Sequence, residues 1–295
     1  MKHIKGIVLA GGHGSRLYPL TFATSKQLLP VYDKPMIYYP ISVLMHANIK
    51  NILIISTKSD LPRFKNLLGD GKHYGINFQY KIQHEPRGIA ESLILAKEFI
   101  GTDDFCLILG DNIFYGDTFK GKLEIGINNL KKGYATIFGT EVSNPEEFGV
   151  ISFDSHGNIK SIQEKPLKPK SNLIVSGLYF YKNSAIEYAE NLIPSNRGEL
   201  EITDINKIFL KNNNLMVERL GKDIFWSDTG TYNSLLYASN FFKNLEKETK
   251  KKAACIEHIA LSMGFINKDK YIKIADSMSK SDYGKYLKKH FNELR

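Results

Sequence analysis

Three short apolar runs mark the first part of the chain. They are GIVLA at residues 6–10, NILIIS at 51–56 and FCLILGD at 105–111, and none of them alternates apolar with polar side chains. Continuous apolar runs are typical of parallel strands that are covered on both faces. The pattern therefore predicts a buried parallel sheet in this part of the chain.

Helical patterns occupy the gaps between these runs. Apolar residues of the segment 89–100 recur at helical spacing, and the segments 38–49 and 60–69 fill the other gaps. A strand, a helix and another strand in repeated order indicate an α/β sheet with right-handed crossovers.

The pattern changes at about residue 134. Four strand-like, partly alternating segments follow, and SHGN at 155–158 is a hairpin turn between two of them. The four segments are YATIFGTEV, GVISFD, IKSIQEKP and LIVSGLYFY. From residue 231 onward the chain is mostly helical, and no linker rich in Gly, Pro or Ser interrupts it. We predict one compact body with three parts, residues 1–133, 134–230 and 231–295.

Composition adds a few constraints. Of the 295 residues, 42% are hydrophobic and 24% are charged, so a folded globular protein with an ample core is expected. The formal net charge of +9 suits anionic partners. The lysines are scattered, however, apart from KETKKK at 247–252, which is better explained as a solvated helix face. We therefore expect no nucleic-acid partner.

The cysteines and the N-terminus exclude several classes. Cys106 and Cys255 have no spacing that suggests zinc or a disulfide framework. The first apolar run is too short for a signal peptide, and no stretch is long enough to span a membrane. These features predict a cytoplasmic protein without a membrane partner.

The glycine-rich stretch LAGGHGSRLYPLTFATSKQLLP at 9–30 follows the first predicted strand. Glycines in that position bring backbone N–H groups close to phosphate, and a following helix adds its positive end. The stretch has no Walker A motif, and the dinucleotide fingerprint fails because Leu17 stands at its third glycine position. Glycine pairs often form no more than a tight turn. Arg16 and Lys26 favour phosphate binding, and two cations suit a triphosphate.

Two aspartates are candidate metal ligands. Asp111 ends a predicted strand, at the sheet edge where α/β proteins bind ligands, although a lone Asp there is often a turn or helix cap. WSDTGT supplies a second carboxylate, Asp228. Mg²⁺ prefers one or two carboxylates together with substrate phosphates and water. The sequence by itself does not show that the two aspartates meet.

Glu164 and Lys165 in IQEKP are a second charged pair. In a strand their side chains would point to opposite faces, so a bulge or turn is needed before both can face one ligand. Pro166 and Pro169 indicate that the strand ends here and that the pair lies in a loop. A surface charge pair is the alternative.

Taken together and in order, these motifs resemble the sugar nucleotidylyltransferases, and among them the bacterial glucose-1-phosphate thymidylyltransferases. The similarity runs over nearly the whole chain, and Lys26-Gln27 stands where uridylyltransferases typically carry Lys-Glu. The motifs are the glycine-rich stretch extended to YYP, GDNIFYG, EFGVISFD, IQEKP, SGLYFY, RGELEITDIN, WSDTGTYNSLLYAS and YGKYL.

The resemblance implies a fold and a reaction. The fold is a Rossmann-like, mixed and mostly parallel sheet flanked by helices, with 1–133 as the nucleotide-binding half, 134–230 as the sugar-binding half and 231–295 as a helical C-terminal subdomain. The reaction transfers a thymidylyl group from dTTP to glucose 1-phosphate by Mg²⁺-dependent in-line displacement, without a covalent enzyme intermediate. Family members are commonly tetrameric.

The resemblance also implies roles for individual residues. Catalysis would use Arg16, Lys26 and Lys165. Mg²⁺ would be held by Asp111 and Asp228. The sugar would contact Gly149, Glu164, Lys165, Val175 and Arg197. The nucleotide would contact Leu9, Ala10, Gly11, Gly12, Gly14, Ser15, Arg16, Lys26, Gln27, Gln83, Gly88 and Asp111.

The chain departs from the family pattern in two places. HEPRGIAES follows Gln83, where the family usually has Pro-Ser-Pro-Asp-Gly-Leu-Ala-Gln, and this bears on base specificity. At the feedback site of the family, Lys222 stands where Arg is typical and His258 where Glu is typical, which implies altered regulation.

Three other functions stay open at this point. They are a uridylyltransferase or an enzyme for another hexose 1-phosphate, a non-catalytic regulatory paralogue, and a nicotinamide-dependent enzyme. A paralogue would be expected to lose the charged site residues, and all of them are present. The failed dinucleotide fingerprint speaks against nicotinamide.

Overall fold

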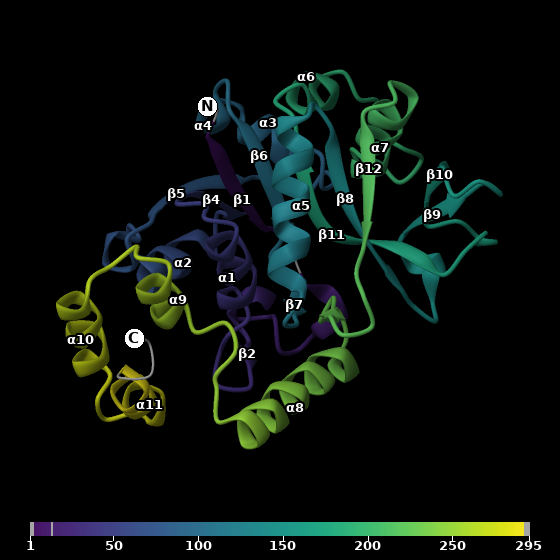
Figure 1. Cartoon of the computed structure of the whole chain (residues 1–295). Helices are drawn as coiled ribbons and strands as arrows, with labels where there is room; N and C mark the ends of the chain where they lie inside the picture. The colour runs from purple at the N-terminus through teal and green to yellow at the C-terminus, as the bar shows by residue number, and fades with distance from the viewer. Residues whose placement is uncertain (1–2, 13, 292–295) are drawn as a thin grey trace.

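A nine-stranded sheet runs through the centre of the molecule, as the computed structural model shows for residues 3–12 and 14–291 (Figure 1). Seven strands follow the order β10-β9-β11-β6-β1-β4-β5, while β8 pairs with β11 and with β12. Four neighbouring strands are mutually parallel, namely β5 (Asn77–Gln83), β4 (Asn51–Thr57), β1 (Ile4–Ala10) and β6 (Asp104–Leu109). The predicted α/β class and the parallel N-terminal strands are confirmed.

The other half of the sheet is mixed. Its strands are β8 (Ala135–Glu141), β9 (Gly149–Phe153), β10 (Ile159–Glu164), β11 (Leu173–Tyr181) and β12 (Leu215–Arg219). β9 and β10 form the predicted hairpin, whereas β12 lies parallel to β8 and was not predicted. All nine residues of β11 are buried, and its antiparallel pairing with β6 joins the two halves.

Helices cover both faces of the sheet, which explains the continuous apolar runs. Val8 and Ile54 pack with α1 (Tyr38–His46), α2 (Leu61–Leu68) and α5 (Phe119–Lys131). Ile7 and Leu53, one residue earlier, pack on the opposite face because successive strand residues point to opposite sides. The helices there are α3 (Glu91–Leu95), α4 (Lys97–Ile100), α6 (Ala185–Glu190) and α7 (Ile202–Lys211). The helix predicted over 89–100 is thus two short helices.

The C-terminal part is helical, as predicted. α8 (Tyr232–Thr249) begins with a capping box between Thr231 and Ser234 and lies below the sheet in Figure 1. The last three helices are α9 (Ile256–Ser262), α10 (Lys268–Ser277) and α11 (Asp282–His290). They group together and reach the sheet through the contact of α9 with α1.

A buried carboxylate ties these helices together. Glu257 of α9 is almost completely buried, and its pKa is raised by that burial. The Tyr283 hydroxyl donates to its Oε2 at 2.7 Å and lies 3.3 Å from the Cys255 Sγ. Both cysteines, Cys106 and Cys255, are free and buried.

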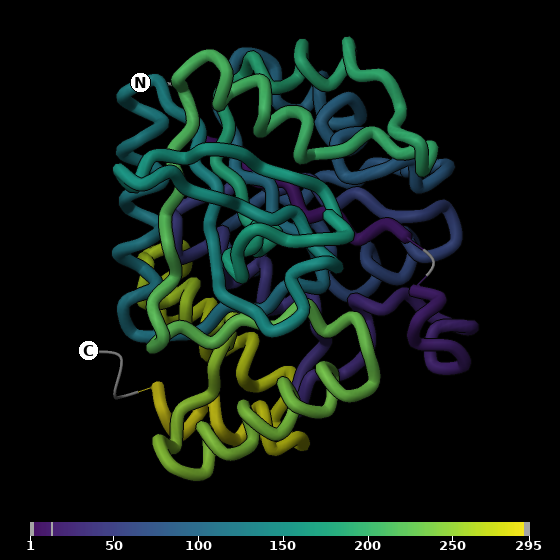
Figure 2. Tube along the Cα trace, turned by 90° about the vertical axis from the view of Figure 1, so that its right-hand side faces the viewer, coloured from purple at the N-terminus to yellow at the C-terminus, as the bar shows by residue number. Residues whose placement is uncertain are grey.

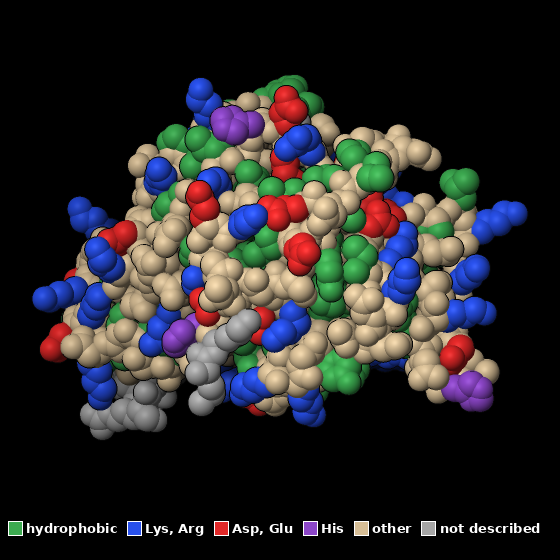
Figure 3. Space-filling model, turned by 90° about the horizontal axis from the view of Figure 1, so that it is seen from above, with side chains coloured by type: hydrophobic (Ala, Val, Ile, Leu, Met, Phe, Trp, Pro, Cys, Tyr) green, Lys and Arg blue, Asp and Glu red, His purple; other side chains and the backbone are tan. Residues whose placement is uncertain are grey.

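On the face in Figure 3, Lys and Arg side chains of the described residues are spread out, and Asp and Glu lie among them. Within residues 3–12 and 14–291, no helix has the length and apolar character needed to cross a membrane.

The Tyr283–Glu257 contact leads to a stability prediction. Tyr283→Phe should lower the free energy of unfolding by about 1–3 kcal/mol, because it removes a donor from a buried carboxylate. Urea denaturation measures the change. Tyr237→Phe, at a side chain that is 62% exposed, is the control and should leave stability unchanged. Equal unfolding midpoints for both variants would contradict the prediction.

Candidate active site

The glycine-rich loop leaves the carboxyl end of β1. Gly12 (φ 98°) and Gly14 (φ 59°) adopt left-handed backbone that favours glycine. A three-residue 3₁₀ turn, Ser15–Leu17, follows, and the first α-helix begins only at Tyr38. The expectation that a helix directly after the loop adds its positive end is therefore wrong. Positive charge at the loop comes instead from the side chains of Arg16 and Lys26. In Figure 2 the purple segment after this loop projects from the edge of the molecule.

Asp111 lies beside the loop because β1 and β6 are parallel neighbours. Leu9 pairs with Leu109 in the sheet, and the Gly110 N–H donates to the Leu9 carbonyl at 2.8 Å. Asp111 follows directly. Its carboxylate forms an ion pair with Lys26 and accepts a 3.0 Å hydrogen bond from the Asn112 side-chain amide. The predicted position of Asp111 at the carboxyl edge of a central strand is confirmed.

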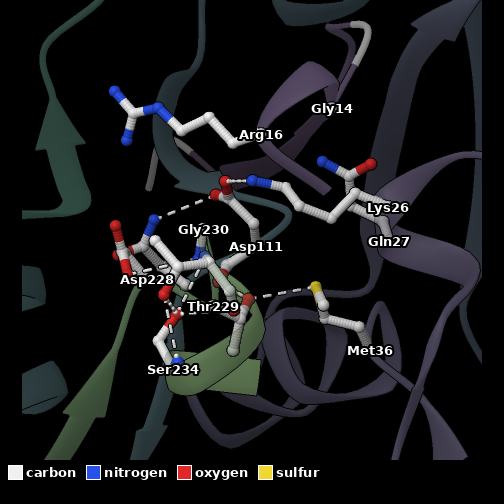
Figure 4. A network of polar contacts seen from close by, with 12 residues as sticks. Gly14, Arg16, Lys26, Gln27, Met36, Asp111, Asp228, Thr229, Gly230 and Ser234 are labelled. Atoms are coloured by element: carbon white, nitrogen blue, oxygen red, sulfur yellow. Dashed lines mark hydrogen bonds and ion pairs between the residues drawn. The ribbon is translucent and has the colours of Figure 1, made fainter. Parts of the chain in front are cut away.

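Asp228 reaches the same place from a distant part of the sequence. It follows β13 (Phe225–Ser227), which pairs with β7 (Ile113–Tyr115) just beyond Asp111. The next residue, Thr229, is fully buried, has a left-handed φ of 42°, and donates its hydroxyl to the Asp111 carbonyl at 2.7 Å. This hydrogen bond fastens one aspartate loop to the other (Figure 4).

Both aspartates line a cavity of about 290 Å³ together with the glycine loop and its two cations. The cavity is lined by Gly14, Ser15, Arg16, Leu17, Lys26, Asp111, Asp228 and Gly230. Burial raises the pKa of Asp228, and the charge of Asp111 adds to the effect, while the Gly230 N–H opposes it. The two carboxylates thus line one cavity together with the cations Arg16 and Lys26.

A second cavity of about 190 Å³ adjoins the first and shares Arg16, Asp111 and Asp228 with it. All five predicted sugar-contacting residues line it, namely Gly149, Glu164, Lys165, Val175 and Arg197. The two cavities therefore meet at the charged residues that the sequence singled out.

Glu164 and Lys165 face this second cavity because the chain turns between them. Glu164 is the last residue of β10, and Lys165 has a left-handed φ of 41° with its N–H bonded to the Phe148 carbonyl at 2.9 Å. The turn required by the strand argument is thus present, but only Lys165 lies in the loop. Burial raises the pKa of Glu164, and a hydrogen bond from the Thr203 hydroxyl lowers it.

Arg197, which lines this cavity, is held by acidic neighbours. Its guanidinium lies 2.7 Å from the Glu199 carboxylate, 3.0 Å from that of Glu201 and 3.9 Å from that of Glu164. Arg16 likewise pairs across the two cavities with Glu147 at 3.4 Å. Both arginines lie at positions where they can exchange a carboxylate for a phosphate.

Comparisons with known proteins agree with this geometry. The sequence pattern of the family described as Nucleotidyl transferase matches residues 5–245. The chain is 49% identical to glucose-1-phosphate thymidylyltransferase of Neisseria meningitidis and 46% identical to that of Mycobacterium tuberculosis, in each case over 96% of this chain and 98% of the relative.

This chain belongs to the nucleotidyl transferase family.

Solved structures extend the comparison. A candidate glucose-1-phosphate thymidylyltransferase from Bacillus anthracis has a TM-score of 0.75 at 42% identity and covers 81% of this chain and 94% of its own. A UDP-glucose pyrophosphorylase bound to UDP-glucose has a TM-score of 0.73 at 23% identity, covering 82% and 99%, and shows the shared fold alone. The nucleotidyl transferase fold expected from the motifs is confirmed.

Several nucleotide-side residues lie outside the two cavities of this nucleotidyl transferase. Leu9 and Ala10 are buried in β1, and Gln27 is buried with its side-chain carbonyl accepting from the Ser25 hydroxyl at 2.6 Å. Gly12 lines a separate cavity. Gly88 (φ 105°) packs so closely that a Cβ would lie 2.4 Å from the Leu200 carbonyl oxygen. Gly11 and Gln83 contact each other. Their roles toward a nucleotide stay predictions.

The structure adds residues that the sequence argument missed. Asn112, Tyr179, Thr203 and Trp226 line the second cavity. The Trp226 indole N–H donates at 2.9 Å both to the Asn112 side chain and to the Ser176 carbonyl. Two features of the sequence could have pointed to these residues. Asn112 directly follows Asp111, and Trp226 is the single tryptophan. Thr203 had no comparable signal.

The two departures at the expected feedback site lie apart within one chain. Lys222 lines a groove of about 1020 Å³, whereas His258 lines a cavity of about 330 Å³ beside α1. Burial is the main cause that lowers the pKa of His258, to about 4. A regulatory role for either residue stays a prediction.

The raised pKa of Asp228 leads to a prediction about stability. Burial disfavours the charged form of Asp228 in the folded state. The free energy of unfolding should therefore fall as the pH rises from the ordinary pKa of 3.8 through the raised pKa of the folded protein. Asp228→Asn should therefore melt higher than the wild type at neutral pH, by about 2–4 °C for each kcal/mol of strain removed. The difference should shrink as the pH falls toward 3.8.

Calorimetry between these pH values provides the measurement. Glu124→Gln, on an exposed turn of α5, removes one negative charge without relieving burial and should not change the melting temperature. A destabilised Asp228→Asn at neutral pH would show that the carboxylate is structurally required.

Proposed function

We propose that this chain transfers a thymidylyl group from dTTP to glucose 1-phosphate, giving dTDP-glucose and pyrophosphate. The observation that carries the proposal is the pair of adjoining cavities that share Arg16, Asp111 and Asp228. A triphosphate in the first cavity and a sugar phosphate in the second would meet at these residues. The full-length similarity to enzymes named glucose-1-phosphate thymidylyltransferase supports the choice of substrates.

The residues of the first cavity would neutralise and position the triphosphate. Backbone N–H groups of Gly14 and Ser15 lie where the chain turns around the cavity, and Arg16 and Lys26 supply positive charge. Arg16 would release Glu147 and stabilise the charge that develops on the leaving pyrophosphate. In-line phosphoryl transfer requires positioning and charge neutralisation and no protein nucleophile.

The residues of the second cavity would hold the attacking sugar phosphate. Besides the shared Arg16, its cations are Lys165 and Arg197, and Glu164 can accept hydrogen bonds from sugar hydroxyls. Thr203 fixes the Glu164 carboxylate and so orients that acceptor. The phosphate oxygen of the sugar would then face the α-phosphate at the junction of the two cavities.

Mg²⁺ fits the acidic wall formed by Asp111 and Asp228. Mg²⁺ takes one or two carboxylates and completes its shell with phosphate oxygens and water. No group of three or more His, Cys, Asp or Glu side chains that could hold a metal occurs among the described residues, so substrate phosphates and water would have to supply the remaining ligands. When bound, the ion would neutralise charge on the reacting phosphates. Tetramer formation and a cytoplasmic location belong to the same proposal.

The proposed reaction is tested by a panel assay for pyrophosphate release. dTTP, UTP and dCTP are each combined with glucose, galactose and mannose 1-phosphates, with and without Mg²⁺. The highest kcat/KM is expected for dTTP with glucose 1-phosphate in the presence of Mg²⁺. Asp111→Asn should lower turnover by orders of magnitude, since metal stabilisation of phosphoryl charge contributes roughly several kcal/mol. Absence of release with dTTP and every sugar phosphate would refute the proposal, and a preference for UTP would replace it with a uridylyltransferase.

The assignment of Lys165 to the sugar phosphate makes a separate prediction. Lys165→Ala should raise KM for glucose 1-phosphate by about 10–100-fold, because a hydrogen bond to a charged group contributes about 1.5–3 kcal/mol. KM for dTTP should change much less. Lys168→Ala removes an exposed lysine from the same loop and serves as the control. A larger effect on dTTP would assign Lys165 to the triphosphate.

A further inference from the structure

The side chain of Gln83 is locked between the glycine loop and a buried acid. Gln83 ends β5 and is 3% exposed. Its Nε2 donates to the Glu91 Oε2 at 2.8 Å. On the other side, its Oε1 occupies the space beside Gly11, where a Cβ would lie 1.9 Å away. One end of the amide therefore faces Glu91 and the other end faces the loop.

Glu91 is in turn held by Arg87. Glu91 is 4% exposed, and its Oε1 accepts from the Arg87 guanidinium at 2.8 and 2.9 Å. Its Oε2 also accepts from the Arg87 backbone N–H at 3.1 Å. Both carboxylate oxygens of Glu91 thus accept hydrogen bonds, and its ion pair with Arg87 joins the two ends of the segment 87–91.

An ionised carboxylate accepts hydrogen bonds and cannot donate them. Glu91 therefore requires the NH₂ end of the Gln83 amide on its own side, which leaves the carbonyl end toward Gly11. A glutamine at position 91 could donate or accept, because its side-chain amide carries both an NH₂ and a carbonyl. It would stabilise either orientation of the Gln83 amide.

We propose that the Arg87–Glu91 pair determines base preference by fixing the Gln83 amide with its carbonyl toward the nucleotide side. This rests on the proposed function, which places a nucleotide at the glycine loop. A fixed acceptor favours a base whose ring N3 carries a hydrogen, as in thymine and uracil. It disfavours cytosine, whose N3 is itself an acceptor. Glu91 acts through Gln83 and is a positioning residue.

The test compares equilibrium binding of dTTP and dCTP, which share the same sugar and phosphates. Glu91→Gln keeps the size of the side chain but lets the Gln83 amide turn over. The preference for dTTP over dCTP, measured by calorimetric titration, should fall about tenfold, as expected for one hydrogen bond of about 1.5 kcal/mol. Tighter dCTP binding should contribute to that fall.

Glu98→Gln is the matched control. Glu98 lies on the neighbouring helix α4 and forms an exposed ion pair with Lys81, so the substitution removes the same charge. Its dTTP to dCTP ratio should equal that of the wild type. If Glu91→Gln does not fold, the double variant R87D/E91Q, which also removes the cation left without its carboxylate partner, provides the same comparison.

The outcomes separate this inference from the proposed function. A folded Glu91→Gln with an unchanged ratio shows that the pair has a structural role alone and overturns the inference, even if the wild type forms dTDP-glucose. A reduced ratio in Glu91→Gln, together with a wild type that releases no pyrophosphate, supports the inference and refutes the proposed reaction. Failure of the wild type to bind either nucleotide overturns both.

Discussion

The parallel pairing of β1 with β6 is the constraint on which the candidate active site depends. It places the carboxyl ends of two buried strands at one edge, so the glycine loop and Asp111 are neighbours although nearly a hundred residues separate them. The strands pair because helices cover both faces and leave no exposed apolar side. A shift in the register of this pair would separate Asp111 from Lys26 and from the loop that both cavities share.

The second aspartate is held at this edge at an energetic cost. Thr229 adopts backbone that non-glycine residues rarely use, and Asp228 keeps a carboxylate in a partly desolvated position beside Asp111. Both features oppose folding, and the Thr229 hydroxyl bond to the Asp111 carbonyl offsets part of the cost. Backbone strain and a perturbed carboxylate pKa at one cleft are typical of functional sites.

The local parts of this arrangement were predictable from sequence, and the tertiary parts were not. Uninterrupted apolar runs predict β1, β4 and β6, because strands that are covered on both faces are apolar throughout. The end of the third run predicts the position of Asp111. The left-handed turn at Lys165 and the 3₁₀ turn after Gly14 depend on backbone angles that the residue types do not specify. β12 was missed because its short segment, LMVER, resembles many exposed segments. The meeting of Asp111 with Asp228 required a contact between distant segments, which only the family resemblance supplied.

The order of the strands gives the proposed substrates a direction. Along this edge of the sheet, Gln83 follows from β5, the glycine loop from β1 and Asp111 from β6, in that order. Sugar-side residues lie beyond them, on β11, β9 and β10. Adjacent strands lie about 4.8 Å apart, so two steps from β5 to β1 span about 10 Å. A nucleotide laid along this edge would place its base at Gln83, its phosphates at the loop and its α-phosphate beside the sugar phosphate. The Gln83 amide touches the loop at Gly11, whereas Arg16, Lys26 and Asp111 line the first cavity. The proposal therefore assigns base selection and phosphoryl transfer to separate residues.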